Sequence, residues 1–246
     1  MQRWDSFADS EIGMSAEDRD RRAAKARSVC HALVAITIVV SLWLWIDPIG
    51  YPLPVLLMLA IPWVAVWVTA HYKGIVVINE KKRDPRPGVG LAFMWSCLLL
   101  APQALFRMHL LEWKRPLLLG LLVAVLLTFA VWQADVALRR QPWAALIMLL
   151  VAIAYGYGAT METNAIFDRS RTMWYQPVIV SKHISRGSKG GSSYYFRLEP
   201  WGPQESEDDV RVSQSFYDAK QPGDFVCIGL RDGALNMPWY FVRDCR

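Results

Sequence analysis

Four polar side chains that can bind or transfer a charge lie close together between two long apolar runs: Gln103, Arg107, His109 and Glu112. If this segment is helical, Gln103 and Arg107 share one face because they are four residues apart. His109 and Glu112 are three apart and share another face. Ionisable groups at membrane depth are candidates for transport or for acid–base chemistry. The alternative is that Arg107 and His109 only extend to the membrane surface beside Trp113.

Two cysteines near the C-terminus, Cys227 and Cys245, could form a disulfide. In an oxidising compartment a bond across this separation would stabilise a small domain by about 3 kcal/mol. A tight hairpin around residue 234, however, would pair Cys227 with a residue near 241, so that the bond needs a bulge or a bend. Both a disulfide and two free thiols therefore remain open. Cys30 and Cys97 fall inside apolar runs, where we interpret them as packing residues.

The sequence contains none of the usual motifs for metals, phosphate cofactors or nucleophilic catalysis. The histidines are scattered, and none has a second ligand at a spacing typical of zinc sites. There is no phosphate-binding loop and no nucleophile elbow. Ser181 and His183 share a strand face, but nothing in the sequence marks an acidic partner. We therefore predict no catalytic residues, no metal and no cofactor.

The elements that position these residues are dominated by five runs that contain no Asp, Glu, Lys or Arg. The runs comprise residues 29–46, 48–72, 87–106, 116–134 and 141–161. A bilayer core of roughly 30 Å needs about 20 apolar helical residues, and the runs are apolar all round rather than amphipathic. We predict an integral membrane protein with about five spans, at residues 29–46, 51–71, 90–112, 116–135 and 141–159.

The distribution of Lys and Arg predicts the orientation in the membrane. With a cytoplasmic N-terminus, the cytoplasmic flanks of the spans hold 12 of these residues and the opposite flanks hold 5. Five spans then place the C-terminal part outside the cytoplasm. The third span is the uncertain one, because Pro102 and Gln103 interrupt it and three positive charges follow. A re-entrant segment there would give four spans and invert the C-terminal part.

After the last run the pattern changes to short segments of β type, separated by turn residues. Residues 187–193 form a turn rich in Gly and Ser, and a hairpin is expected around Asp232 to Ala234. About five strands in some 70 residues predict a small all-β, barrel-like domain. The predicted fold is thus an α-helical transmembrane bundle followed by an extramembrane β-domain. Its parts are a polar arm (1–28), the transmembrane domain (29–161), a connector (162–173) and the β-domain (174–246).

Two segments resemble a group of uncharacterised bacterial inner-membrane proteins. One is Gly233-Ala234-Leu235-Asn236-Met237-Pro238-Trp239-Tyr240, which resembles the close of a β-domain that follows several spans in those proteins. The other is residues 81–87 leading into a span that ends in Ala104-Leu105-Phe106-Arg107. The resemblance implies a bacterial inner membrane and a periplasmic β-domain. It implies no activity and no catalytic residues.

Three hypotheses of function follow. The first is a non-catalytic inner-membrane protein whose periplasmic β-domain docks on a protein partner in the membrane or periplasm, as an accessory or assembly subunit. The second is a small transporter or channel component that uses the polar cluster. The third is a membrane enzyme that acts on lipid or envelope substrates through His109 and Glu112. Nucleic acid is not an expected partner, because residues 160–246 hold equal numbers of basic and acidic side chains, eleven of each.

Overall fold

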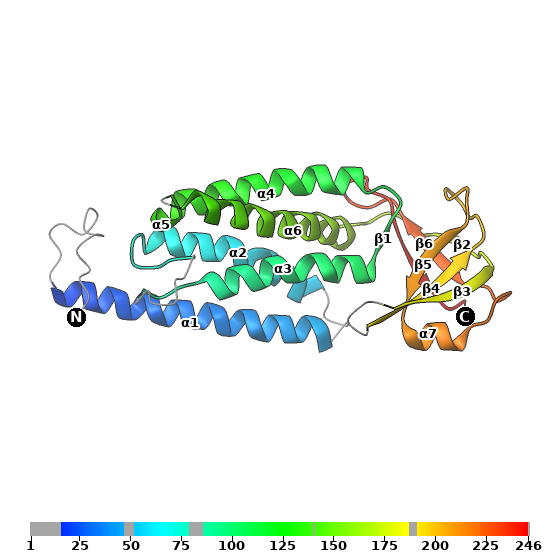
Figure 1. Cartoon of the computed structure of the whole chain (residues 1–246), viewed down its shortest axis with the longest axis horizontal. Helices are drawn as coiled ribbons and strands as arrows, with labels where there is room; N and C mark the ends of the chain where they lie inside the picture. Colours follow the sequence, from blue (N-terminus) through cyan, green and yellow to red (C-terminus); the bar gives the residue numbers. More distant parts are fainter. Residues whose placement is uncertain (1–15, 47–51, 79–85, 140, 187–190, 246) are drawn as a thin grey trace. The chain divides into compact units, whose positions relative to one another are not determined.

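The computed structural model describes residues 16–46, 52–78, 86–139, 141–186 and 191–245 (Figure 1). Contacts divide the chain into two compact units. The first comprises the described residues up to Ala104 together with Pro116–Glu162, and the second comprises Leu105–Arg115 together with Thr163–Arg246. Most of residues 81–87 and part of the Gly/Ser-rich turn lie outside the described residues.

Six helices run through the first unit and its borders (Figure 1): α1 (Ala16–Ile46), α2 (Pro52–His71), α3 (Gly90–Arg107), α4 (Lys114–Ala134), α5 (Val136–Arg139) and α6 (Pro142–Ile166). Five of them, all except α5, are long and apolar enough to cross a membrane. Many of their large apolar side chains are exposed, for example Leu118 at 67% and Phe129 at 62%. An apolar surface on long helices suits a lipid environment, so the expected multi-pass membrane architecture is supported.

Glycines allow helix α6 to approach its neighbours closely within the first unit. A Cβ atom on Gly156 would lie 2.0 Å from the carbonyl oxygen of Gly120 in α4, and one on Gly158 would lie 2.5 Å from the backbone nitrogen of Ala101 in α3. Small residues at such points are typical of helix packing in membranes. Helix α6 also contacts α2, since Trp63 Nε1 donates a hydrogen bond to the hydroxyl of Tyr155.

Helix α3 ends at Arg107, earlier than the predicted end at residue 112, and it does not continue to Trp113. It is continuous from Gly90 through Pro102, which gives no support to a re-entrant segment. The chain then forms the short strand β1 (His109–Leu110). Because His109 lies in a strand, it shares no helix face with Glu112, and that expectation is corrected. Backbone pairing with the C-terminal strand competes with helix continuation here, as shown by the bond from Leu111 N to Pro238 O at 3.3 Å.

The second unit contains two antiparallel sheets and one short helix, α7 (Gln214–Ala219). One sheet has the strand order β1-β7-β6-β2, with β2 at Met173–Tyr175, β6 at Cys227–Arg231 and β7 at Trp239–Arg243. The other has the order β3-β4-β5, formed by Ile179–Arg186, Ser192–Leu198 and Asp208–Val212. The β-domain is therefore confirmed, but its described strands form two open sheets and no closed barrel. The predicted β-domain, residues 174–246, did not include strand β1 of the four-stranded sheet, which lies in the α3–α4 connection.

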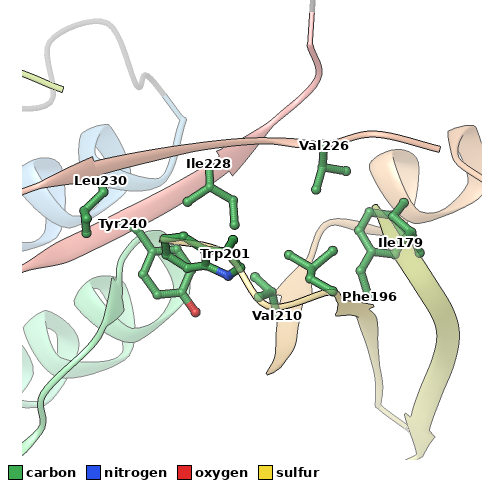
Figure 2. Packing of buried hydrophobic residues seen from close by; sticks show 9 residues of the cluster. Ile179, Phe196, Trp201, Val210, Val226, Ile228, Leu230 and Tyr240 are labelled. Carbon is green, nitrogen blue, oxygen red and sulfur yellow. The ribbon is translucent and has the colours of Figure 1, made fainter. Parts of the chain in front are cut away.

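A hydrophobic core holds the second unit together (Figure 2). Strand β6 contributes Ile228 and Leu230, and the three-stranded sheet contributes Phe196 and Val210, all almost fully buried. The other members are Ile179, Leu198, Trp201, Val226 and Tyr240. Burial of these side chains from both sheets is what makes two small sheets a single stable unit, since neither sheet alone could cover its apolar face.

Candidate functional site

A polar cleft forms where strand β1 stops. His109 pairs with Tyr240 and Leu110 with Trp239, so the β1–β7 ladder is only two residues long. Before His109 the chain turns away into helix α3, and the edge of β7 beside Phe241 and Val242 stays unpaired on that side. Strands β4 and β5 and the first turn of α7 provide the other walls. The cleft has a volume of about 480 Å³.

We define the polar cleft by its lining residues: Phe106, Arg107, His109, Ser192, Ser193, Tyr194, Arg211, Val212, Ser213, Gln214, Phe216, Phe241 and Val242. Two of these are arginines and three are serines, and none is acidic. The guanidinium of Arg211 lies over the ring of Phe106, with its carbon 4.4 Å from the ring centroid. This cation–π contact holds the positive charge at the wall of the cleft.

His109 is half-buried, and its imidazole stacks on the ring of Tyr240 with the centroids 5.0 Å apart. Burial lowers the pKa of His109 below its ordinary value, and the positive charge of Arg211 acts in the same direction. Asp208 acts in the opposite direction, as does a hydrogen bond to the backbone of Arg211. His109 is therefore largely neutral at pH 7, so the two arginines carry the positive charge of the cleft.

The four residues of the predicted polar cluster are only partly brought together. Arg107 is the last residue of α3 and lines the cleft with His109. Gln103 is buried within α3 and does not line the cleft. Glu112 is exposed and forms an ion pair with Arg115 at the start of α4, with Oε2 and Nε 3.4 Å apart. The pairing of His109 with Glu112, on which the enzyme hypothesis depended, is not present.

The outer side of the four-stranded sheet carries a second group of notable residues, which we call the aromatic face: Trp174, Trp239, Phe241, Arg231 and Arg243. The rings of Trp174 and Phe241 meet edge to face at 5.6 Å. Gly229 between them has no side chain, and a Cβ there would lie 2.5 Å from the ring of Phe241. The guanidinium carbon of Arg243 lies 4.0 Å from the ring centroid of Trp174. Trp174 nevertheless remains 45% exposed.

Cys227 and Cys245 are joined by a disulfide in the structure, with their Cα atoms 5.1 Å apart. The register explains how this is possible. The β6–β7 loop is longer than a tight turn, so Cys227 pairs with Arg243 rather than with residue 241. Cys245 then lies two residues beyond that partner, past the end of β7, where the chain can bend toward Cys227.

Ser181 and His183 lie on strand β3, and His183 lies near an acidic side chain. His183 stacks on Tyr195, and its Nδ1 lies 3.9 Å from a carboxylate oxygen of Asp209. Asp209 is the acidic partner that the sequence did not mark, but it is bound by Arg197 through two hydrogen bonds of 3.0 and 3.1 Å. These bonds lower the pKa of the Asp209 carboxyl. No hydrogen bond joins Ser181 to His183 in the described structure, so the group lacks the geometry of a nucleophilic triad.

The described residues also form no candidate metal site. Within the part of the chain that the structure describes, no three His, Cys, Asp or Glu side chains gather closely enough to hold an ion.

Sequence reasoning missed Arg211 and the three serines of the cleft, because they come from separate strands. Only the pairing of β4 with β5 brings Ser193 and Tyr194 beside Val212 and Ser213.

No protein-family model matches the chain, and neither a curated protein nor a solved structure matches it.

Proposed function

We propose that this protein is a non-catalytic subunit of a membrane complex, whose extramembrane β-domain docks on a protein partner. The aromatic face carries the proposal. Trp and Arg are the residue types most enriched among the energetically important positions of protein interfaces. Here Trp174 and Trp239 lie on one side of a sheet together with Arg231 and Arg243, and Trp174 is half exposed on an edge strand.

The way the domain is attached supports the same function. Its first strand belongs to the α3–α4 connection and its remaining strands follow α6, so the unit is tied to three apolar helices through the chain itself. A partner that binds this unit is thereby linked to the membrane-spanning part of the chain.

For the location, we propose a bacterial inner membrane with a cytoplasmic N-terminus and a periplasmic β-domain. The excess of Lys and Arg beside the first span and the second connection favours this orientation. The disulfide in the β-domain is consistent with it, because such bonds persist in oxidising compartments. An alkaline phosphatase fused after the last residue should be active in bacterial cells, and a green fluorescent protein fused there should be dark. The reverse pattern would overturn this orientation.

Site-specific photo-crosslinking in cells tests the docking function. A photoreactive amino acid at Arg243, an exposed member of the aromatic face on strand β7, should give one discrete adduct with a membrane or periplasmic protein. The same probe at Glu205, in an exposed loop, is the position control and should give none. Mass spectrometry of the adduct identifies the partner.

A substitution in the aromatic face shows whether the adduct reports docking. Trp174→Ser should remove the adduct while the protein remains folded in the membrane, as judged by its thermal unfolding midpoint. Trp143→Ser changes a more exposed tryptophan, 62% exposed in helix α6, and should leave the adduct unchanged. If the probe at Arg243 gives no discrete adduct, or if Trp174→Ser leaves the adduct intact, the aromatic face is not the docking surface.

A further inference from the structure

Strand β2 is an open edge of the four-stranded sheet. In the part of the chain that the structure describes, β2 pairs with β6 on one side, and no strand pairs with its other side. Its three residues, Met173–Tyr175, include no charged side chain and no proline. The edges of the other sheet differ, since β3 has a register shift near its start and β5 contains three charged residues. Charges, prolines and irregular register hinder the addition of a further strand, so β2 is the edge that accepts one.

The hydrogen-bond pattern shows which backbone groups of this edge point outward. Val226 N donates a hydrogen bond to Pro177 O at 3.2 Å, and this bond continues the register of the β2–β6 pairs. In an antiparallel ladder, residues that bond to the neighbouring strand alternate with residues whose N–H and C=O point the other way. The odd-numbered residues therefore bond to β6. The backbone groups of Thr172, Trp174 and Gln176 are directed away from the sheet.

These outward backbone groups are accessible to another chain. Trp174 and Gln176 are exposed, and Thr172 is half-buried. No described residue hydrogen-bonds to the backbone of Trp174 on its outward side. Donors and acceptors at every second residue match the main chain of an extended peptide, which presents its own groups at the same spacing.

The side chains beside the edge indicate the character of that peptide. The guanidinium carbon of Arg243 lies 4.0 Å from the ring centroid of Trp174, and Arg243 is exposed. Among the described residues, no carboxylate forms an ion pair with Arg243. The neighbouring carboxylate of Asp244 is instead paired with Lys220 at 2.6 Å. A carboxylate on the added chain would complement the charge of Arg243.

We infer that an extended, acidic segment of the docking partner adds to β2 as a fifth strand of this sheet. Its main chain bonds to Thr172, Trp174 and Gln176, and one of its carboxylates lies beside Arg243. The inference rests on the proposed docking function and specifies how the partner is held. In strand addition, main-chain hydrogen bonds provide affinity and neighbouring side chains provide specificity.

Photo-crosslinking from both ends of the edge tests the extended shape. Probes at Thr172 and at Gln176 of the full-length protein should each capture the protein that the Arg243 probe captures. The two probe positions lie about 13 Å apart, at roughly 3.3 Å per residue. Peptide mapping should therefore place the two crosslinks about four residues apart on the partner. A bound helix, which rises about 1.5 Å per residue, would place them about nine residues apart.

A backbone substitution makes the test specific for strand pairing. Gln176→Pro removes the N–H that points to the partner, and it should lower the yield of the Arg243 adduct about tenfold. Gln176→Ala is the matched control, because it also removes the side-chain amide but keeps the backbone N–H, and its yield should equal that of the unaltered protein. Thr172→Pro and Thr172→Ala form a second pair, in case Gln176→Pro does not fold, as judged by the thermal unfolding midpoint.

The outcomes separate strand addition from docking. Strand addition is overturned, and docking is not, if the Arg243 probe gives an adduct but the probes at Thr172 and Gln176 give none. The same holds if the two crosslinks lie about nine residues apart, or if folded proline and alanine variants give equal yields of the Arg243 adduct. Absence of the Arg243 adduct from the otherwise unaltered protein overturns both proposals.

Discussion

His109 and Tyr240 are paired across β1 and β7 with their rings stacked, although they belong to distant parts of the sequence. This pair joins the α3–α4 connection to the C-terminal hairpin. Two apolar helices of spanning length, α4 and α6, lie between the paired segments. An even number of crossings returns the chain to the same side of a membrane, so the pairing is compatible with both helices crossing fully.

The first prediction concerns the pH dependence that His109 confers. Its pKa is lowered in the folded state, so between the folded and the unfolded pKa the unfolded chain binds more protons. The free energy of unfolding should therefore fall as the pH is lowered through about 6.5, by at most about 1.4 kcal/mol per pH unit. His109→Phe should remove this dependence, as measured by thermal unfolding between pH 5 and 8. His31→Gln, a substitution in helix α1, should retain it; loss of the dependence in both variants would rule out His109 as the source.

The second prediction concerns Asn164, which is buried near the end of α6. Its side-chain nitrogen donates to Met237 O at 2.9 Å, and its side-chain oxygen accepts from Leu235 N at 2.9 Å. Asn164→Ala should lower the free energy of unfolding by about 1 to 3 kcal/mol, because it leaves two backbone groups of the β6–β7 loop unsatisfied. Ser206→Ala, in an exposed loop, is the control. Equal unfolding midpoints for the two variants would contradict the role of Asn164.

The third prediction concerns the close contact between α4 and α6. Gly156→Val should destabilise the protein by at least about 2 kcal/mol, because the added carbons meet backbone atoms that cannot move aside. Gly191→Val is the matched control, since a Cβ atom there meets nothing within 4 Å. Thermal unfolding in a mild detergent measures both. A midpoint for Gly156→Val within experimental error of the unaltered protein would show that the helices do not pack in this way.

The fourth prediction concerns the disulfide. Unreduced, denatured protein should react with two equivalents of a maleimide, at Cys30 and Cys97, and reduced protein with four. Cys245→Ser should lower the free energy of unfolding by about 3 kcal/mol under oxidising conditions and have a much smaller effect under reducing ones. Mass spectrometry counts the labels. Four labels without reduction would mean that the bond does not form.

The sequence was sufficient for the five long apolar helices. A span needs only about 20 apolar residues without charge, a local property that residues 29–46 or 116–134 display without help from the rest of the chain. The change from apolar runs to short segments rich in Val, Tyr and Phe was likewise enough to predict a β-domain after the last span. Both features follow from composition within a short window, which is why they could be read directly.

Only the tertiary structure decided the identity of β1, the register of the last hairpin and the lining of the polar cleft. His109 and Leu110 have no strong local preference, and their pairing with Tyr240 and Trp239 overrides the helix that their position after α3 predicted. The length of the β6–β7 loop fixes which residue faces Cys227, and no local pattern specifies it. Arg107 and Arg211 share a cleft only because the end of a helix and a strand far from it in the chain belong to one packed unit. Long-range packing of this kind leaves no periodic signal in the sequence.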